Sequence, residues 1–176
     1  MKGVSHALVG LSGVLSFHAL VVPLAPGLTD LAVVSAVGVA ASLLPDVDSD
    51  EATIRQITGT ARSGGCVGRL VSGIVYLLGG HRGALTHSLL AWAIASFVAG
   101  VYFRGNMSMV AFAIGYLSHL IADALTVEGV PLLWPLWPKR IRLLPALLAI
   151  RTGGAREYMA MVGLGVFMVL VVFGRL

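Results

Sequence analysis

The chain alternates long apolar stretches with shorter polar ones. Five stretches come close to or reach the roughly 17–25 residues of a membrane-spanning helix: residues 4–22, 28–44, 84–103, 107–126 and 158–173. A further apolar run near 67–80 begins with Arg69 and is too short to cross, which favours a re-entrant or interfacial helix. The pattern predicts an all-α fold, a polytopic transmembrane helical bundle with about five spanning helices.

Composition supports a membrane protein. Of the 176 residues, 57% are hydrophobic and 11% are charged, and the mean hydropathy is +0.93. A soluble domain of this size could not bury so much apolar surface, so we exclude a soluble enzyme, a disordered chain and a coiled coil. The single cysteine, Cys66, excludes an internal disulfide framework and a cysteine zinc cluster. We therefore expect one integral-membrane domain over residues 1–176.

The basic residues serve membrane topology better than nucleic-acid binding. The net charge is +4 and the pI about 9.7, but the basic residues are scattered over short loops and form no basic stripe. With five spans and a cytoplasmic N-terminus, all 12 Lys and Arg residues except Arg104 and Arg175 lie inside. Six spans would move the basic run 139–156 outside, against the positive-inside rule. We predict a multi-pass protein of the cell membrane, with its N-terminus in the cytoplasm and no nucleic-acid partner.

Small residues recur within the apolar stretches. Such residues let helices approach closely in lipid, and they would also support a homo-oligomer; they are Gly10, Gly13, Ala36, Gly38, Ala40 and Ala41. The Pro/Trp segment at 131–138 is typical of an interfacial anchor. Contact with a lipid substrate is the alternative for that segment.

Seven ionisable residues fall at one end of the predicted bundle. Ionisable side chains at membrane depth are costly, so each is a candidate functional residue. One lies at the start of the first helix, two after the second, two just before and just inside the third, and two in the last turns of the fourth: His6, Asp46 and Asp48, His81 and His87, and His119 and Asp123. Reversing the whole protein in the membrane would keep them together. His18 lies toward the far side and is excluded.

The spacing of these residues suits a metal ion. His119 and Asp123 are four residues apart and share a helical face, while Asp46 and Asp48 are two apart in an extended segment after Pro45. Alone, the first pair could be hydrogen-bonded partners and the second a solvated turn. Together, imidazoles and carboxylates without a thiolate suit an open catalytic site. We expect one or two zinc ions, with manganese as the alternative.

The segments around these residues resemble the YdjM-like family of membrane-bound, metal-dependent hydrolases. The matching segments keep the family's order and are residues 5–10, 44–48, 81–88, 115–126 and 129–135. They define a catalytic core over 5–138 and leave 139–176 as a C-terminal loop and last helix. Ser49 stands where the family often has a histidine.

The family is in turn distantly similar to the zinc-dependent phospholipase C and single-strand nuclease superfamily, and that similarity implies phosphoester chemistry. The hypothesis is a hydrolase at the cytoplasmic membrane face that uses a metal-activated water on a membrane lipid, in the first place a phospholipid. Its metal ligands would be His6, Asp46, His87, His119 and Asp123. Asp48 and His81 would be further ligands or orienting groups, and Arg82 would neutralise developing negative charge. A metal-binding transporter or sensor without hydrolytic chemistry is the alternative.

Overall fold

The computed structural model describes residues 1–46, 85–104 and 106–173, and its named elements are all helices. They are α1 (Gly3–Leu20), α2 (Leu28–Leu43), α5 (Leu89–Tyr102), α6 (Met107–Ala124) and α7 (Ala155–Phe173). These helices correspond to the five apolar stretches, so the predicted all-α class is confirmed for the described chain. The expected re-entrant or interfacial helix near 67–80 lies outside the described residues.

One predicted boundary is wrong, and it affects the site. We expected the third apolar helix to begin near residue 84, but α5 begins at Leu89. Ser88 has an extended backbone, and its Oγ accepts a hydrogen bond from the Ala91 amide at 3.1 Å, which caps the helix. His87 therefore lies in the turn before the helix rather than just inside it.

The helices differ in their ability to cross a membrane. By length and composition, α1 and α6 qualify as spanning helices, whereas α2 and α5 are apolar but shorter, at 16 and 14 residues. The distribution of side chains suits a lipid environment. Most serines of α1, α2 and α6 are buried, as are His6 and His119, while large apolar side chains such as Phe97 and Met159 are more than 70% exposed.

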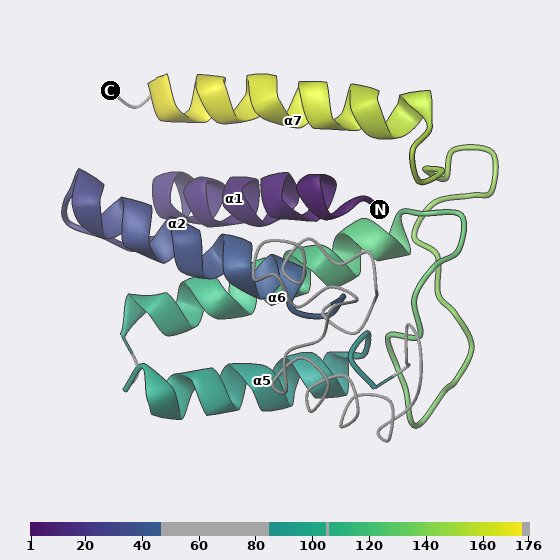
Figure 1. The fold of residues 1–176 in the computed structure, drawn as a ribbon, viewed down its shortest axis with the longest axis horizontal. Coiled ribbons are helices and arrows are strands. Elements are labelled where there is room, and N and C mark those ends of the chain that lie inside the picture. Colours follow the sequence, from purple (N-terminus) through teal and green to yellow (C-terminus); the bar gives the residue numbers. More distant parts are fainter. Residues whose placement is uncertain (47–84, 105, 174–176) are drawn as a thin grey trace, which may run out of the picture.

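The centre of the bundle is a close contact of α1, α2 and α6, with α7 beside α1 and α5 beside α6 (Figure 1). Glycines make this contact close. A Cβ atom at Gly115 of α6 would lie 2.0 Å from the Gly38 carbonyl oxygen of α2, and one at Gly10 of α1 would lie 2.6 Å from Ser42 Cβ. The expected close approach through small residues is therefore present.

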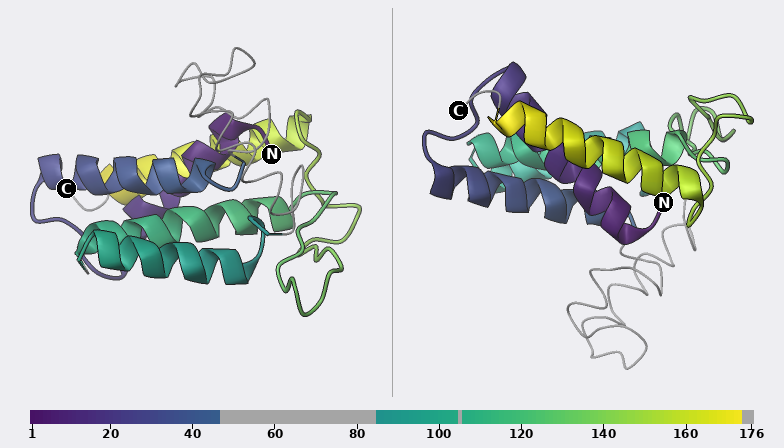
Figure 2. Two further views of the ribbon diagram at one scale, coloured as in Figure 1. Left: turned by 60° about the horizontal axis from the view of Figure 1, so that its bottom comes forward. Right: turned by 90° about the horizontal axis from the view of Figure 1, so that it is seen from above.

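One end of the bundle collects the start of α1, the end of α2, the start of α5 and the end of α6, as Figures 1 and 2 show. The connection 125–154 folds over this end and is held by main-chain bonds. It forms two isolated bridges, Thr126 with Ile150 and Val130 with Ile141, and the latter pair exchanges N–H···O bonds of 2.8 and 3.1 Å. This connection supplies one wall of the candidate site.

Helix α7 is attached to α1 at the same end through Glu157, which is 2% exposed. Its carboxylate accepts hydrogen bonds from Ser5 Oγ at 2.5 Å and from the amides of Lys2 and Gly153 at 2.9 and 2.6 Å. Ser5 precedes His6, so this network fixes the turn of α1 that carries the first candidate ligand.

Candidate metal centre

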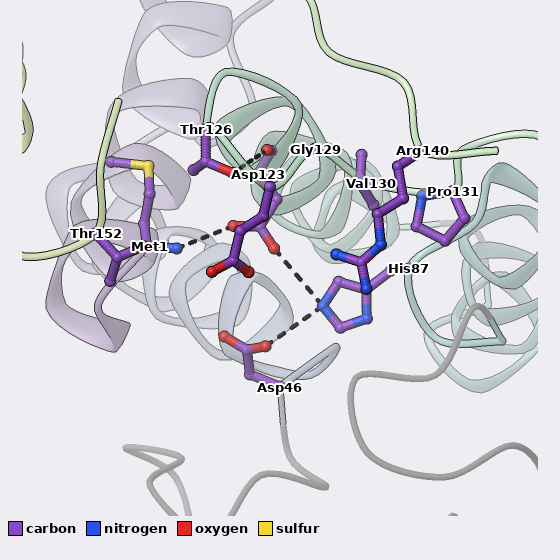
Figure 3. A pocket seen from close by; sticks show the side chains of 11 residues that line it. Met1, Asp46, His87, Asp123, Thr126, Gly129, Val130, Pro131, Arg140 and Thr152 are labelled. Atoms are coloured by element: carbon purple, nitrogen blue, oxygen red, sulfur yellow. Dashed lines mark hydrogen bonds and ion pairs between the residues drawn. The ribbon is translucent and has the colours of Figure 1, made fainter. Parts of the chain in front are cut away.

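The candidate site is a cluster of three histidines and two aspartates drawn from four segments. His6 comes from α1, Asp46 follows α2, His87 precedes α5, and His119 and Asp123 lie one turn apart on α6. Figure 3 shows Asp46, His87 and Asp123 directed toward one another. The structure therefore brings together residues that are up to 117 positions apart in the chain.

The glycine contact in the bundle centre positions α6 against α2 at this cluster. Ser42 lies one turn beyond Gly38, and His119 lies one turn beyond Gly115. The close approach brings His119 Nδ1 to 2.7 Å from the Ser42 carbonyl oxygen. A carbonyl can only accept, so Nδ1 carries the proton and Nε2 presents a lone pair to the cluster.

Contacts at Nδ1 also orient the His87 ring. Its Nδ1 lies 2.9 Å from Thr86 Oγ1, and the Tyr116 hydroxyl donates to the Thr86 carbonyl at 2.7 Å. These contacts hold the ring with its Nε2 toward the two aspartates. Such outer contacts fix the orientation and tautomer of metal-binding histidines in proteins.

Four of the five residues offer ligand atoms at the spacing of a metal's coordination shell. His87 Nε2 lies 3.3 Å from Asp46 Oδ1, 3.7 Å from Asp123 Oδ2 and 3.3 Å from His119 Nε2. His119 Nε2 lies 3.9 Å from Asp46 Oδ1 and 3.4 Å from Asp123 Oδ2. Bonds of about 2.0–2.1 Å in tetrahedral geometry put ligand atoms about 3.3 Å apart. The four atoms all lie within 4.8 Å of one another, so this quartet can surround one ion.

The electrostatics of the quartet favour a cation at its centre. Burial by itself would raise the pKa of the Asp46 carboxyl, but the contact with His87 and the nearby rings of His119 and His6 hold that pKa below its ordinary value. Asp46 is thus ionised, and its carboxylate approaches the same imidazole nitrogens as that of Asp123. Two carboxylates held this close repel one another unless a positive charge lies between them, which a metal ion or a protonated histidine supplies.

His6 completes the cluster from the opposite side of the carboxylates. It is fully buried, and neither ring nitrogen makes a hydrogen bond within the described chain. Its Nε2 lies 3.3 Å from Asp123 Oδ1 and 3.7 Å from Asp46 Oδ2, and its ring stacks on His119 at 3.8 Å between centroids. The Met1 amino group also lies 3.1 Å from Asp123 Oδ1. A buried imidazole without a hydrogen bond is costly, and a metal ion would satisfy it.

A small cavity of about 30 Å³ borders the cluster. It can hold one or two water-sized particles, since a water needs about 10–15 Å³. Asp46, His87 and Asp123 line one side, and the connection after α6 lines the other with Thr126, Glu128, Gly129, Val130, Pro131, Arg140 and Thr152. In Figure 3 the Arg140 side chain extends from the connection into the cavity, toward the side lined by His87.

Sequence reasoning named the five clustered residues and overlooked part of the cavity wall. We assigned the basic run that contains Arg140 to topology alone, yet Arg140 lines the cavity. Thr126 ends one of the matching segments but was not singled out, and Thr152 carries no motif; the folded path of the connection places both here. Asp48, His81 and Arg82, predicted as ligands or catalytic groups, lie outside the described residues.

Comparison with known proteins identifies the family. A family model described as YdjM inner membrane protein matches residues 1–176. Inner membrane protein YdjM of Escherichia coli (strain K12) is 37% identical over 108 residues, which are 58% of this chain and 50% of that protein, and its Shigella flexneri namesake matches equally. The chain thus spans about half the length of these relatives.

A more evenly matched relative is the uncharacterized protein YvsG of Bacillus subtilis (strain 168), 33% identical over 135 residues, 77% of this chain and 75% of that protein. No solved structure matches. The family match over the whole chain agrees with the apolar helices and with the resemblance noted from the motifs. The chain belongs to the YdjM inner membrane protein family.

Proposed function

We propose that this protein is a membrane-embedded, metal-dependent hydrolase that cleaves a phosphoester bond in a lipid, most directly a phospholipid. The observation that carries the proposal is the quartet of Asp46, His87, His119 and Asp123. Five distances between its ligand atoms lie between 3.3 and 3.9 Å, longer than ordinary hydrogen bonds and close to the edges of a coordination shell.

The donor set favours zinc, with manganese as the alternative ion. Two imidazoles and two carboxylates suit zinc, manganese and iron, whereas calcium and magnesium prefer oxygen ligands. When bound, such an ion lowers the pKa of a water molecule and polarises a phosphoryl oxygen. The chain's own part is to hold the ligands in place, through the Ser42 carbonyl for His119 and through Thr86 for His87.

The proposed substrate follows from the surroundings of the quartet. Arg140 borders the cavity beside Asp46 and His87, and a guanidinium is well suited to bind phosphate oxygens. The cavity itself admits water but no headgroup, so a phosphate would sit at its opening, against Arg140. The exposed apolar surface of the helices and the family's membrane location make a lipid the natural source of that phosphate.

We further propose five membrane spans, with the N-terminus and the metal centre on the cytoplasmic side. This topology gives α2, α5 and α7 the role of spanning helices beside α1 and α6. It is supported by the excess of Lys and Arg at the end of the bundle that carries the site. The 125–154 connection, with Lys139 and Arg140, would then face the cytoplasm.

The first experiment measures metal content. Detergent-purified protein is compared with the His119→Ala/Asp123→Ala double variant by elemental analysis after incubation with zinc or manganese. We expect at least one tightly bound transition-metal ion per chain in the wild type and loss of that ion in the variant. His18→Ala is the matched control, because His18 lies on α1 at the far end, where its Nδ1 accepts a bond from the Leu24 amide. Wild-type protein without bound metal would end the proposal.

The second experiment tests hydrolysis. Metal-loaded protein is reconstituted in vesicles of labelled phospholipids and assayed for release of a phosphorylated headgroup, of diacylglycerol or of inorganic phosphate. We expect one of these products, its loss in the double variant and a lower rate in Arg140→Ala. A metal-loaded protein that releases none of them but carries zinc or manganese across the vesicle membrane would instead support the transporter.

A further inference from the structure

We propose that the cluster holds two divalent metal ions, the second at a subsite formed by His6 Nε2, Asp46 Oδ2 and Asp123 Oδ1. The quartet of the proposed function uses only one oxygen of each aspartate. Asp46 turns Oδ1 toward His87 and His119, and Asp123 turns Oδ2 toward the same two rings. The remaining oxygens, one from each carboxylate, both face His6.

The two distances from His6 to the aspartate oxygens match those within the quartet. His6 Nε2 lies 3.3 Å from Asp123 Oδ1 and 3.7 Å from Asp46 Oδ2, within the 3.3–3.9 Å range found among the quartet's atoms. Three protein ligands with room for water are typical of an open metal site. Each aspartate would bridge the two ions through its two oxygens.

The burial of His6 without a hydrogen bond supports the second ion separately from these distances. Its side chain is fully buried between helices, and neither Nδ1 nor Nε2 makes a hydrogen bond in the described chain. A single ion in the quartet would leave Nε2 with only the two carboxylate oxygens at 3.3 and 3.7 Å, outside hydrogen-bond geometry, whereas an ion in the second subsite would bind Nε2 directly. Nδ1 stays unpaired among the described residues in both arrangements. The cost of burying an unpaired polar group therefore argues for the second ion.

The arrangement of His6 and His119 suits one ion for each ring. Their rings stack at 3.8 Å between centroids with an interplanar angle of 18°, and each directs Nε2 toward an Asp123 oxygen. With two ions bound, each ring would hold its own ion, and the two oxygens of Asp123 would divide between them, as in known two-metal sites.

A competing cation is present on the same side. The Met1 ammonium lies 3.1 Å from Asp123 Oδ1 and could neutralise that oxygen in place of a metal. In that case the cluster would bind one ion only. The number of ions per chain separates the two arrangements.

The test uses Mn²⁺, whose electron spin reports both number and proximity. Wild-type protein in detergent is stripped with a chelator, titrated with Mn²⁺ and followed by electron paramagnetic resonance. We expect two bound ions per chain with a spin-coupled spectrum. In His6→Gln we expect one ion with an uncoupled spectrum and a second-ion affinity lower by at least about 100-fold. His18→Gln, a matched change in the same helix, should keep both ions.

The results of this titration test the second subsite separately from the proposed hydrolase activity. One ion per chain in the wild type, or two coupled ions in His6→Gln, would overturn the second subsite. If His6→Gln does not fold, the wild-type spectrum alone decides, since coupling requires two neighbouring ions. This inference rests on the metal centre and not on the reaction. If the protein binds two ions but hydrolyses no lipid, only the hydrolase proposal is refuted. If it hydrolyses lipid with a single bound ion, only the second subsite is refuted.

Discussion

Replacing Gly115 by alanine should damage the metal centre from one helical turn away. The new Cβ would lie 2.0 Å from the Gly38 carbonyl oxygen and 2.7 Å from the Gly38 carbonyl carbon. Both obstacles are backbone atoms, so no side-chain rotation can relieve the contact. A C···O contact needs about 3.3 Å, and α6 must therefore move away from α2 by about 1.3 Å at this point.

The movement acts directly on the His119 ring. The hydrogen bond from His119 Nδ1 to the Ser42 carbonyl is 2.7 Å, and a displacement of this size would stretch it to about 4 Å, beyond hydrogen-bonding reach. Loss of such an orienting bond typically lowers metal affinity about 10–100-fold. Overpacking of this kind also destabilises a core by about 1–3 kcal/mol.

The assay is zinc competition against a chromophoric chelator, with the melting temperature measured on the same detergent-purified samples. Gly163→Ala on α7 is the matched control, because a Cβ atom there has nothing within 4 Å; it should bind zinc like the wild type. Gly115→Ala protein that is folded and binds zinc with wild-type affinity would refute the argument that this glycine contact positions His119.

Three further outcomes are expected. Glu157→Gln should lower the free energy of unfolding by about 1–3 kcal/mol, because its amide nitrogen would face a backbone amide, of either Gly153 or Lys2, and cannot accept from it. Thermal melts compared with Asp30→Asn, which changes an exposed carboxylate of α2, measure this loss. Equal melting temperatures of the two variants would contradict it. Tyr116→Phe removes the hydrogen bond from the Tyr116 hydroxyl to the Thr86 carbonyl and should weaken zinc binding about tenfold. Unchanged zinc affinity in the competition assay would show that this hydrogen bond does not orient His87. Zinc at about 100 times its dissociation constant should raise the free energy of unfolding of the wild type by about 2.7 kcal/mol, and a chelator should reverse this increase. If neither zinc nor chelator changes the melting temperature, the folded state binds no zinc.

The helices and most of the cluster were predictable because their signals are local. Each helix is a largely apolar run, and Pro45 marks a boundary that follows from one residue's chemistry. His119 and Asp123 share a face because of helical periodicity alone. The other ligands could be expected nearby because ionisable residues are rare in this chain and recur at the same end of successive helices.

The remainder depends on contacts between distant segments. Nothing local indicates that Arg140 returns to the cavity, because its place is set by main-chain bonds between Val130 and Ile141. The division of the aspartate oxygens between His6 and the other two histidines depends on where α1 crosses α6, which no periodicity specifies. The start of α5 was predicted too early because the apolar Ala84 and Leu85 were counted as its first residues, although Ser88 caps the helix.

The way the 125–154 connection is held has a consequence for how this family can diversify. The pairings of Thr126 with Ile150 and of Val130 with Ile141 involve peptide groups, which every residue except proline supplies in full. Apart from Gly129, which must be glycine because its φ is +65° and a Cβ atom there would lie 2.7 Å from the Ile141 carbonyl oxygen, the path of the cavity wall does not depend on particular side chains. The metal-facing residues lie on other segments or at the end of α6. The side chains at the cavity opening can therefore change among relatives without rebuilding the metal centre.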